Sequence, residues 1–174
     1  MCVIIVKEAG IKLPSENMLR KAAVYNPHGF GFCTKRRLFK TLSIERFLNE
    51  VGKVETNEPC VLHFRFATQG SVKTSNSHPF KQDGVCFSHN GVLHNVKAKN
   101  DQTDSEIFFI NDVVPVINEY GFDSDEVGEL LEQCAIFECS RFALLNQATG
   151  KIITFGRFHD YKGCKYSNNR VFEW

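Results

Sequence analysis

Short apolar runs, each ended by polar or turn residues, dominate the hydrophobic pattern of this chain. They have the length and the β-branched and aromatic content of buried strands. The runs that predict strands are residues 3–6, 29–34, 59–66 and 84–88, a long hairpin of about 135–146 and 151–155, and a short terminal strand at 170–174. Asn90-Gly91 followed by Val92-Leu93 predicts a tight turn with a short return strand.

Between these runs, apolar residues recur at helical spacing behind residues that suit a helix N-cap. The predicted helices are residues 16–24, 44–52, 104–120 and 124–134, with Ser15, Ser43, Thr103 and Asp123 as the respective N-caps. Thr103 and Glu106 have the spacing of a capping box, which places Asp104 in the first turn of the third helix. Pro115 is expected to disturb that helix.

The order of strands and helices predicts an α+β fold in which helices pack outside two stacked sheets. A chain of 174 residues is long enough for such a core. We find no linker, repeat or low-complexity segment, so we expect residues 1–174 to form one domain.

The composition of the chain argues against some classes of function. Hydrophobic residues make up 43% of the chain and charged residues 24%, with a net charge of +1, so no overall field would recruit nucleic acid or an anionic membrane. The sequence has no signal peptide and no apolar run of about 18 residues, which favours a cytoplasmic protein. The seven cysteines lack CxxC spacing, a pattern typical of a reducing compartment.

Three polar clusters follow strand-like runs, which predicts a site at the strand ends. They read His-Phe-Arg-Phe-Ala-Thr-Gln-Gly at 63–70, Ser-Asn-Ser-His-Pro-Phe at 75–80 and Phe-Ser-His-Asn-Gly-Val-Leu at 87–93. The turn-rich stretch 67–77 is suited to close over a small substrate. Zinc is an alternative chemistry, because the residue types of His78, Cys86, His89 and His94 suit it, although their spacing matches no familiar zinc pattern.

A further candidate site residue is Cys2, which lies far from these clusters in sequence and follows Met1 directly. If Met1 is removed, Cys2 carries both a thiol and a free α-amine. Their reference pKa values are about 8.5 and about 7.7–8.0, so a proton passes between them at little cost near neutral pH. Nucleophile and base would then belong to one residue.

Together, Cys2 and the downstream clusters resemble the class II glutamine amidotransferases, which are amino-terminal-nucleophile (Ntn) hydrolases. The resemblance rests on Cys2, His63-x-Arg65-x-Ala67-Thr68-x-Gly70, Asn76-x-His78-Pro79-Phe80, His89-Asn90-Gly91 and Thr103-Asp104-Ser105-Glu106 in unbroken order. Several ordered clusters are more specific than any one of them. The resemblance implies a four-layer αββα sandwich.

The resemblance also implies a role for each matching residue. Cys2 would attack the glutamine side-chain amide and form a thioester, with the Asn90 side chain and the Gly91 N–H as oxyanion donors. Arg65 would bind the substrate α-carboxylate and Asp104 the α-ammonium. Thr68 and His78 would shape the pocket. No cofactor or metal is implied.

Taken singly, each position has an ordinary structural interpretation: an exposed strand arginine for Arg65, a turn at His78-Pro79, a hairpin at Asn90-Gly91 and a helix-start acid for Asp104. The chain also departs from many members, which have Thr-His-Gly where Gln69 stands between Thr68 and Gly70, and glycine where Val3 stands.

Three functions stay open at this point. The first is hydrolysis of L-glutamine, with ammonia released to a separately encoded synthetase or transferase subunit. The second is amidohydrolysis of another γ-glutamyl compound by the protein alone. The third is a catalytically silent binding module of the same fold. Because every catalytic position is present, the first two are favoured over the third.

Overall fold

The computed structural model describes residues 2–98 and 101–172. Within these residues the strands form two antiparallel sheets. The six-stranded sheet has the order β3-β2-β4-β1-β10-β9, made of β1 (Val3–Lys7), β2 (Phe30–Thr34), β3 (Leu38–Thr41), β4 (Cys60–Phe64), β9 (His159–Tyr161) and β10 (Cys164–Tyr166). The four-stranded sheet has the order β5-β6-β7-β8, made of β5 (Phe80–Gln82), β6 (Val85–Asn90), β7 (Arg141–Asn146) and β8 (Ile152–Phe155).

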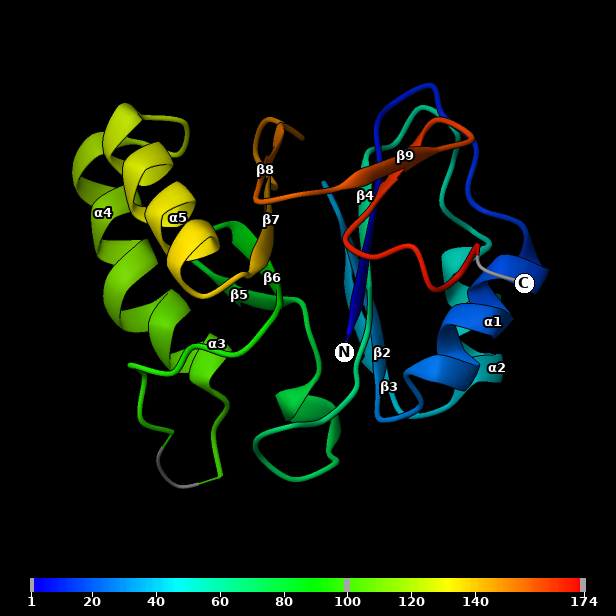
Figure 1. Cartoon of the computed structure of the whole chain (residues 1–174). Coiled ribbons are helices and arrows are strands. Elements are labelled where there is room, and N and C mark those ends of the chain that lie inside the picture. Colours follow the sequence, from blue (N-terminus) through cyan, green and yellow to red (C-terminus); the bar gives the residue numbers. More distant parts are fainter. Residues whose placement is uncertain (1, 99–100, 173–174) are drawn as a thin grey trace.

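Helices cover the outer face of each sheet (Figure 1). The six-stranded sheet carries α1 (Glu16–Tyr25) and α2 (Ile44–Val51). The four-stranded sheet carries α3 (Asp104–Phe108), the π-helical segment η2 (Phe109–Val113), α4 (Val114–Tyr120) and α5 (Asp125–Phe137). The predicted α+β class and the four-layer αββα sandwich are therefore confirmed.

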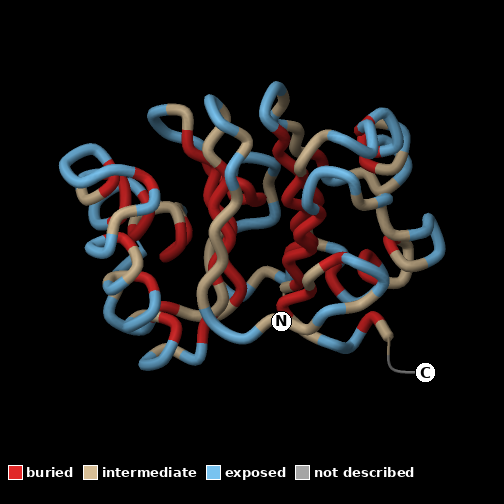
Figure 2. Tube along the Cα trace, turned by 90° about the horizontal axis from the view of Figure 1, so that it is seen from above, coloured by how far each residue is buried: buried red, intermediate tan, exposed pale blue. Residues whose placement is uncertain are grey.

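Three apolar clusters separate the four layers. One lies between the six-stranded sheet and its helices, and a second between the four-stranded sheet and its helices. The third lies between the two sheets and contains Ile4, Val61, Cys86 and Leu145. Figure 2 shows the same arrangement from above, with the buried segments gathered in the two central sheets and exposed segments on the outer helices.

The register of β1 determines where the site forms. β1 lies between β4 and β10, and Val3 pairs with Phe64, so the first residue of β1 lies beside the last residue of β4. β1 also faces β6 across the space between the sheets. As a result, Cys2, the residues after Phe64 and the end of β6 at Asn90 meet at one end of the sandwich.

The predicted caps hold for two helices. The Ser43 and Thr103 side chains accept hydrogen bonds from the first turns of α2 and α3. Ser15 precedes α1 but makes no side-chain cap bond. The prediction for Asp123 is wrong: Ser124 caps α5, because the Asp123 carboxylate is paired with Lys151 instead.

The helix predicted over 104–120 is present, with the expected disturbance just before Pro115. The chain from Asp104 to Tyr120 is helical throughout, and a π-helical turn, Phe109–Val113, separates α3 from α4. Pro115 has no N–H and its ring crowds the carbonyl four residues earlier, which explains a widened turn at this point.

Three strand predictions need correction, and some short strands were missed. β6 continues through Asn90, which pairs with Arg141 of β7, so Asn90-Gly91 is not a hairpin turn and residues 92–93 form no return strand. α5 extends to Phe137, and β7 therefore begins later than predicted. β5, β9 and β10 are three residues each and were not predicted. Residues 170–172 form a turn, and 173–174 lie outside the described residues.

No helix in the described ranges combines the length and apolar character needed to cross a membrane.

Candidate active site

The Cys2 side chain lies at the junction of β1 and the end of β4. Its Sγ accepts a hydrogen bond from the Phe66 N–H at 3.2 Å, and its carbonyl oxygen accepts one from the Asn168 side-chain amide at 2.6 Å. Burial raises the pKa of the Cys2 thiol above its ordinary value, and the Phe66 amide and the charge of Arg65 oppose that shift. The thiol is therefore protonated near neutral pH and needs a base before it can attack.

Around Cys2 the chain forms a small recess. It is lined by Cys2, Arg65, Phe66, Thr68, Gln69, His78, His89, Gly91, Thr103, Asp104 and Ser105. Every predicted site residue except Asn90 thus lines one recess. Its free volume is about 20 Å³, which is room for about one water molecule.

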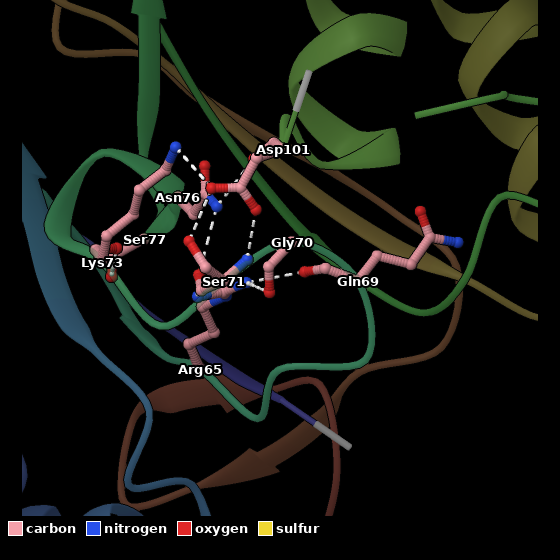
Figure 3. A network of polar contacts seen from close by, with 8 residues as sticks. All are labelled: Arg65, Gln69, Gly70, Ser71, Lys73, Asn76, Ser77 and Asp101. Carbon is pink, nitrogen blue, oxygen red and sulfur yellow. Dashed lines mark hydrogen bonds and ion pairs between the residues drawn. The ribbon is translucent and has the colours of Figure 1, made fainter. Parts of the chain in front are cut away.

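Arg65 is bonded to the loop of residues 67–77 (Figure 3). Its guanidinium donates to the carbonyl oxygens of Gln69 at 2.7 Å, Gly70 at 3.2 Å and Ser71 at 2.9 Å. Arg65 is 3% exposed, which excludes the alternative of a solvent-facing strand arginine. Its cationic group is therefore buried at the recess, and backbone oxygens accept from both of its terminal nitrogens.

Asp101 fixes the same loop from the other side (Figure 3). Its carboxylate accepts from the Ser71 N–H and hydroxyl, both at 2.6 Å, and forms an ion pair with Lys73 at 2.8 Å. The Asn76 side-chain amide donates to the carbonyl oxygens of Ser71 and Asp101. These bonds lower the pKa of the Asp101 carboxyl well below its usual range. The 67–77 loop is thus held closed against Arg65.

Asp104 lies at the start of α3 with both carboxylate oxygens engaged. Oδ2 accepts from the Leu93 N–H and Oδ1 from the Ser105 N–H, each at 2.8 Å. Thr103 caps the helix through the Glu106 N–H, so Asp104 is fixed by the helix start. Its carboxylate lines the same recess as Arg65.

Asn90 and Gly91 end β6 beside the recess. Asn90 is 1% exposed, and its Nδ2 donates to the Ser167 hydroxyl at 2.9 Å. Among the described residues, Asn90 Oδ1 has no hydrogen-bond partner although it is buried. A Cβ on Gly91 would lie 2.0 Å from Ser140 Oγ, so only glycine fits at this close approach.

Three buried histidines lie at the recess: His78 and His89 line it, and His63 contacts both. His63 Nε2 is 3.1 Å from the His89 carbonyl oxygen, and the rings of His63 and His78 lie 4.2 Å apart. His89 is held between the hydroxyls of Ser105 and Ser140. Desolvation lowers the pKa of all three histidines, to about 3 for His63. They are therefore neutral at physiological pH and do not add positive charge at the recess.

The zinc alternative does not fit this geometry. Cys86 is buried in the cluster between the sheets, and His94 is 75% exposed and pairs with Glu138 at 2.7 Å. In the part of the chain that the structure describes, no three histidine, cysteine or acidic side chains are grouped so as to hold a metal ion.

Sequence reasoning missed several residues that hold the site together. Ser167 and Asn168 contact Asn90 and Cys2 from the far end of the chain, and Asp101 holds the 67–77 loop. Their separation in sequence from the residues they contact left no local pattern to find. The helical start at Thr103 could have suggested Ser105, which lies in the same capping box as Asp104.

Comparison with known proteins identifies the family of this chain. The sequence profile of the class-II glutamine amidotransferases matches residues 40–141, more than half of the chain. Cys2, Ser167 and Asn168 lie outside the matched segment. A search of curated protein sequences gave no match.

One solved structure shares the fold of this chain. Glutamine phosphoribosylpyrophosphate (PRPP) amidotransferase from B. subtilis, in complex with ADP and GMP, aligns with 99% of this chain and 43% of its own, at 13% identity and a TM-score of 0.58. A structure described as the allosteric regulatory enzyme of purine biosynthesis aligns with 88% of this chain and 35% of its own, at 16% identity and a TM-score of 0.48. The chain thus spans less than half the length of either. On the profile match, the protein belongs to the class-II glutamine amidotransferases.

Proposed function

We propose that this protein hydrolyses the side-chain amide of glutamine, with Cys2 as an amino-terminal nucleophile exposed by removal of Met1. The observation that carries the proposal is the gathering of Cys2, Arg65, Asp104 and Gly91 at one recess in a chain of this family. We also propose that residues 1–174 act as one glutaminase domain.

The chemistry follows from the state of Cys2. As Sγ bonds to the amide carbon, the thiol proton passes to the free α-amine and the carbonyl electron pair moves onto oxygen. The pair then returns, the C–N bond breaks, and the departing nitrogen takes up the proton and leaves as ammonia. Water adds to the thioester with the amine as base, which releases glutamate and restores the thiol.

Arg65 and Asp104 are proposed to recognise the substrate head group. Arg65 offers a planar fork that matches a carboxylate, and Asp104 presents a fixed negative charge to an ammonium. Because the Arg65 donors are bonded to loop carbonyls, the substrate carboxylate would replace those oxygens as the 67–77 loop opens. Thr68, on this loop, and His78, which lines the recess, are proposed to shape the pocket.

The tetrahedral intermediate carries a negative oxygen that needs donors. The proposed donors are the Asn90 side-chain amide and the Gly91 N–H, which end β6 beside Cys2. Removing one such donor typically lowers kcat by about 10²–10³-fold. The close approach of Gly91 to Ser140 supports the proposal, because it fixes the backbone at this point.

The closed 67–77 loop favours a glutaminase that is slow by itself. We propose that a separately encoded, ammonia-accepting subunit opens or reorders this loop when it binds, so that glutamine is consumed mainly when the acceptor is present. The alternative, a self-sufficient amidohydrolase for another γ-glutamyl compound, would turn over its substrate rapidly without any partner.

The test is to incubate untagged protein with L-glutamine and measure glutamate and ammonia, after intact-mass measurement has established that Met1 is absent. Cys2→Ala should abolish hydrolysis, and 6-diazo-5-oxo-L-norleucine should label Cys2 alone. Cys139→Ala is the matched control, because Cys139 is an exposed free cysteine. Hydrolysis that persists in Cys2→Ala, or equal loss in both variants, would refute the proposal.

A further inference from the structure

Ser167 connects the strand that begins at Cys2 to the side chain of Asn90. It follows β10 directly and continues alongside β1, where its N–H donates to the Ile4 carbonyl oxygen at 3.0 Å. Its hydroxyl oxygen accepts from the Ile4 N–H at 2.8 Å and from Asn90 Nδ2 at 2.9 Å. Ser167 is 1% exposed, so water does not compete for these bonds.

The Asn90 amide is only half satisfied in this arrangement. Nδ2 is bonded to Ser167, whereas Oδ1 is buried without a partner among the described residues. A serine hydroxyl has one donor and two acceptor positions. If the Asn90 amide turns over, the Ser167 hydroxyl can donate to Oδ1 and still accept from Ile4, and Nδ2 becomes free to donate elsewhere.

We propose that Ser167 is a positioning residue that holds Asn90 Oδ1, so that Nδ2 points to the oxygen of the tetrahedral intermediate. The inference rests on the proposed function and assigns the orientation of its oxyanion donor. In the turned arrangement each polar group of the pair has a partner once that oxygen is present. Buried amides that are fully satisfied are strongly preferred over those that are not.

The same segment also fixes the nucleophile. Asn168, the next residue, donates from Nδ2 to the Cys2 carbonyl oxygen at 2.6 Å. Residues 167–168 therefore contact the backbone of the nucleophile and the side chain of the proposed oxyanion donor at once. Because adjacent residues contact both groups, this segment, and not the 67–77 loop, connects the nucleophile to the proposed oxyanion donor.

The decisive variant is Ser167→Ala, which removes the hydroxyl that would orient Asn90. We expect kcat to fall about 10- to 100-fold, less than the roughly 10²–10³-fold cost of losing an oxyanion donor outright. The KM for glutamine should change less than about twofold, because Arg65 and Asp104 bind the head group. Ser88→Ala is the matched control: Ser88 is a fully buried serine of β6 whose hydroxyl has no partner among the described residues.

A double-mutant cycle shows whether Ser167 acts through Asn90. In an Asn90→Ala background, adding Ser167→Ala should lower kcat less than twofold further, whereas independent effects would multiply. Should Ser167→Ala not fold, as judged by circular dichroism, Ser167→Cys takes its place, because its thiol is a weaker donor. The same non-additivity is then expected.

Two ligands distinguish a loss of Asn90 orientation from a general disruption of the site. The aldehyde analogue of glutamine adds to Cys2 by forming an S–C bond while the thiol proton passes to the α-amine and the carbonyl electron pair moves onto oxygen, so its adduct needs the oxyanion donors. L-Glutamate does not. Ser167→Ala should weaken aldehyde binding about as much as kcat and leave glutamate binding unchanged.

The outcomes are distinct. If wild-type protein neither hydrolyses glutamine nor binds the aldehyde, the proposed function fails and the inference fails with it. If the wild type is active but Ser167→Ala keeps wild-type kcat, multiplies with Asn90→Ala, or loses glutamate binding equally, the inference alone is overturned.

Discussion

The Arg65 guanidinium donates a 2.9 Å hydrogen bond to the carbonyl oxygen of Ser71, six residues further along the chain. The group proposed to bind the substrate carboxylate therefore holds the 67–77 loop when no substrate is bound. Loop closure and carboxylate binding compete for the same donors. A change in either residue that weakens this contact should make substrate entry easier and the closed 67–77 loop less stable.

Arg65→Lys is expected to raise the KM for glutamine at least about tenfold, because a lysine cannot form the bidentate pair that a guanidinium makes with a carboxylate. Steady-state glutaminase kinetics measure the change. Arg36→Lys, in the exposed turn before β3, is the control and should leave KM unchanged. Unaltered KM in Arg65→Lys would show that Arg65 serves only to hold the loop.

Asp101→Asn should loosen the 67–77 loop without unfolding the protein. The change keeps the shape of Asp101 but removes the charge that pairs with Lys73 and accepts from Ser71. We expect trypsin to cleave after Lys73 at least about threefold faster, with the Tm lowered by less than about 2 °C, as for an exposed pair. Mass spectrometry of timed digests identifies the cut.

The control for the loop is Asp123→Asn, which breaks another exposed ion pair, with Lys151, far from the recess. Equal cleavage after Lys73 in both variants, or in neither, would contradict the assignment of Asp101.

Acid should destabilise the fold through its buried histidines. Folding lowers the pKa of His63 to about 3 and of His89 to about 4, with His78 shifted in the same direction by burial. The unfolded chain therefore binds protons that the folded chain does not. The free energy of unfolding is therefore at its full value above about pH 6.5. It decreases as pH falls below that value, by up to about 1.4 kcal/mol per pH unit for each histidine.

His78→Phe should remove one of the protons that only the unfolded chain binds. Both His78 ring nitrogens lack partners among the described residues, so an apolar ring of similar size should leave stability at pH 7 equal or higher. Urea unfolding between pH 5 and 7 should show a slope shallower by up to about 1.4 kcal/mol per pH unit, with the full difference at the acid end of that range. An unchanged slope would mean that His78 titrates normally.

Gly31→Ala should destabilise the protein by about 1–3 kcal/mol, the usual cost of overpacking a close contact. A Cβ there would lie 2.1 Å from the His78 carbonyl oxygen, which is backbone and cannot turn aside. Gly128→Ala in α5 is the opposite case, because a Cβ there meets nothing within 4 Å. It should stabilise by up to about 1 kcal/mol through helix propensity. Thermal or urea unfolding of the pair checks both signs.

Much of the fold followed from local patterns. The apolar runs around Val3 and Cys60 are long enough to identify buried strands, and Ser43 and Thr103 mark helix starts correctly. The predictions that failed concern residues whose partners are distant in sequence. Asn90-Gly91 has hairpin chemistry, but pairing of Asn90 with Arg141 extends the strand through it. Asp123 suits a cap, but Lys151 takes its carboxylate.

The residues of the candidate site also differ in whether a local sequence pattern marks them. The residues proposed to touch substrate stand in short motifs, so the sequence placed Arg65, Asp104 and Gly91 near Cys2. The residues that hold them in place do not. Asp101 and Ser167 act through contacts with segments 30 or more positions away, and neither has a neighbouring residue that would mark it.

The pairing of Ile5 with Tyr166 has a consequence for synthesis of the protein. The edge of β1 beside β10 stays unpaired until Tyr166, far along the chain, has been synthesised. Until then Cys2 lacks Asn168, and Asn90 lacks Ser167. A nascent chain that ends before residue 167 would thus carry the Cys2 thiol without the contacts that residues 167 and 168 make at Asn90 and Cys2.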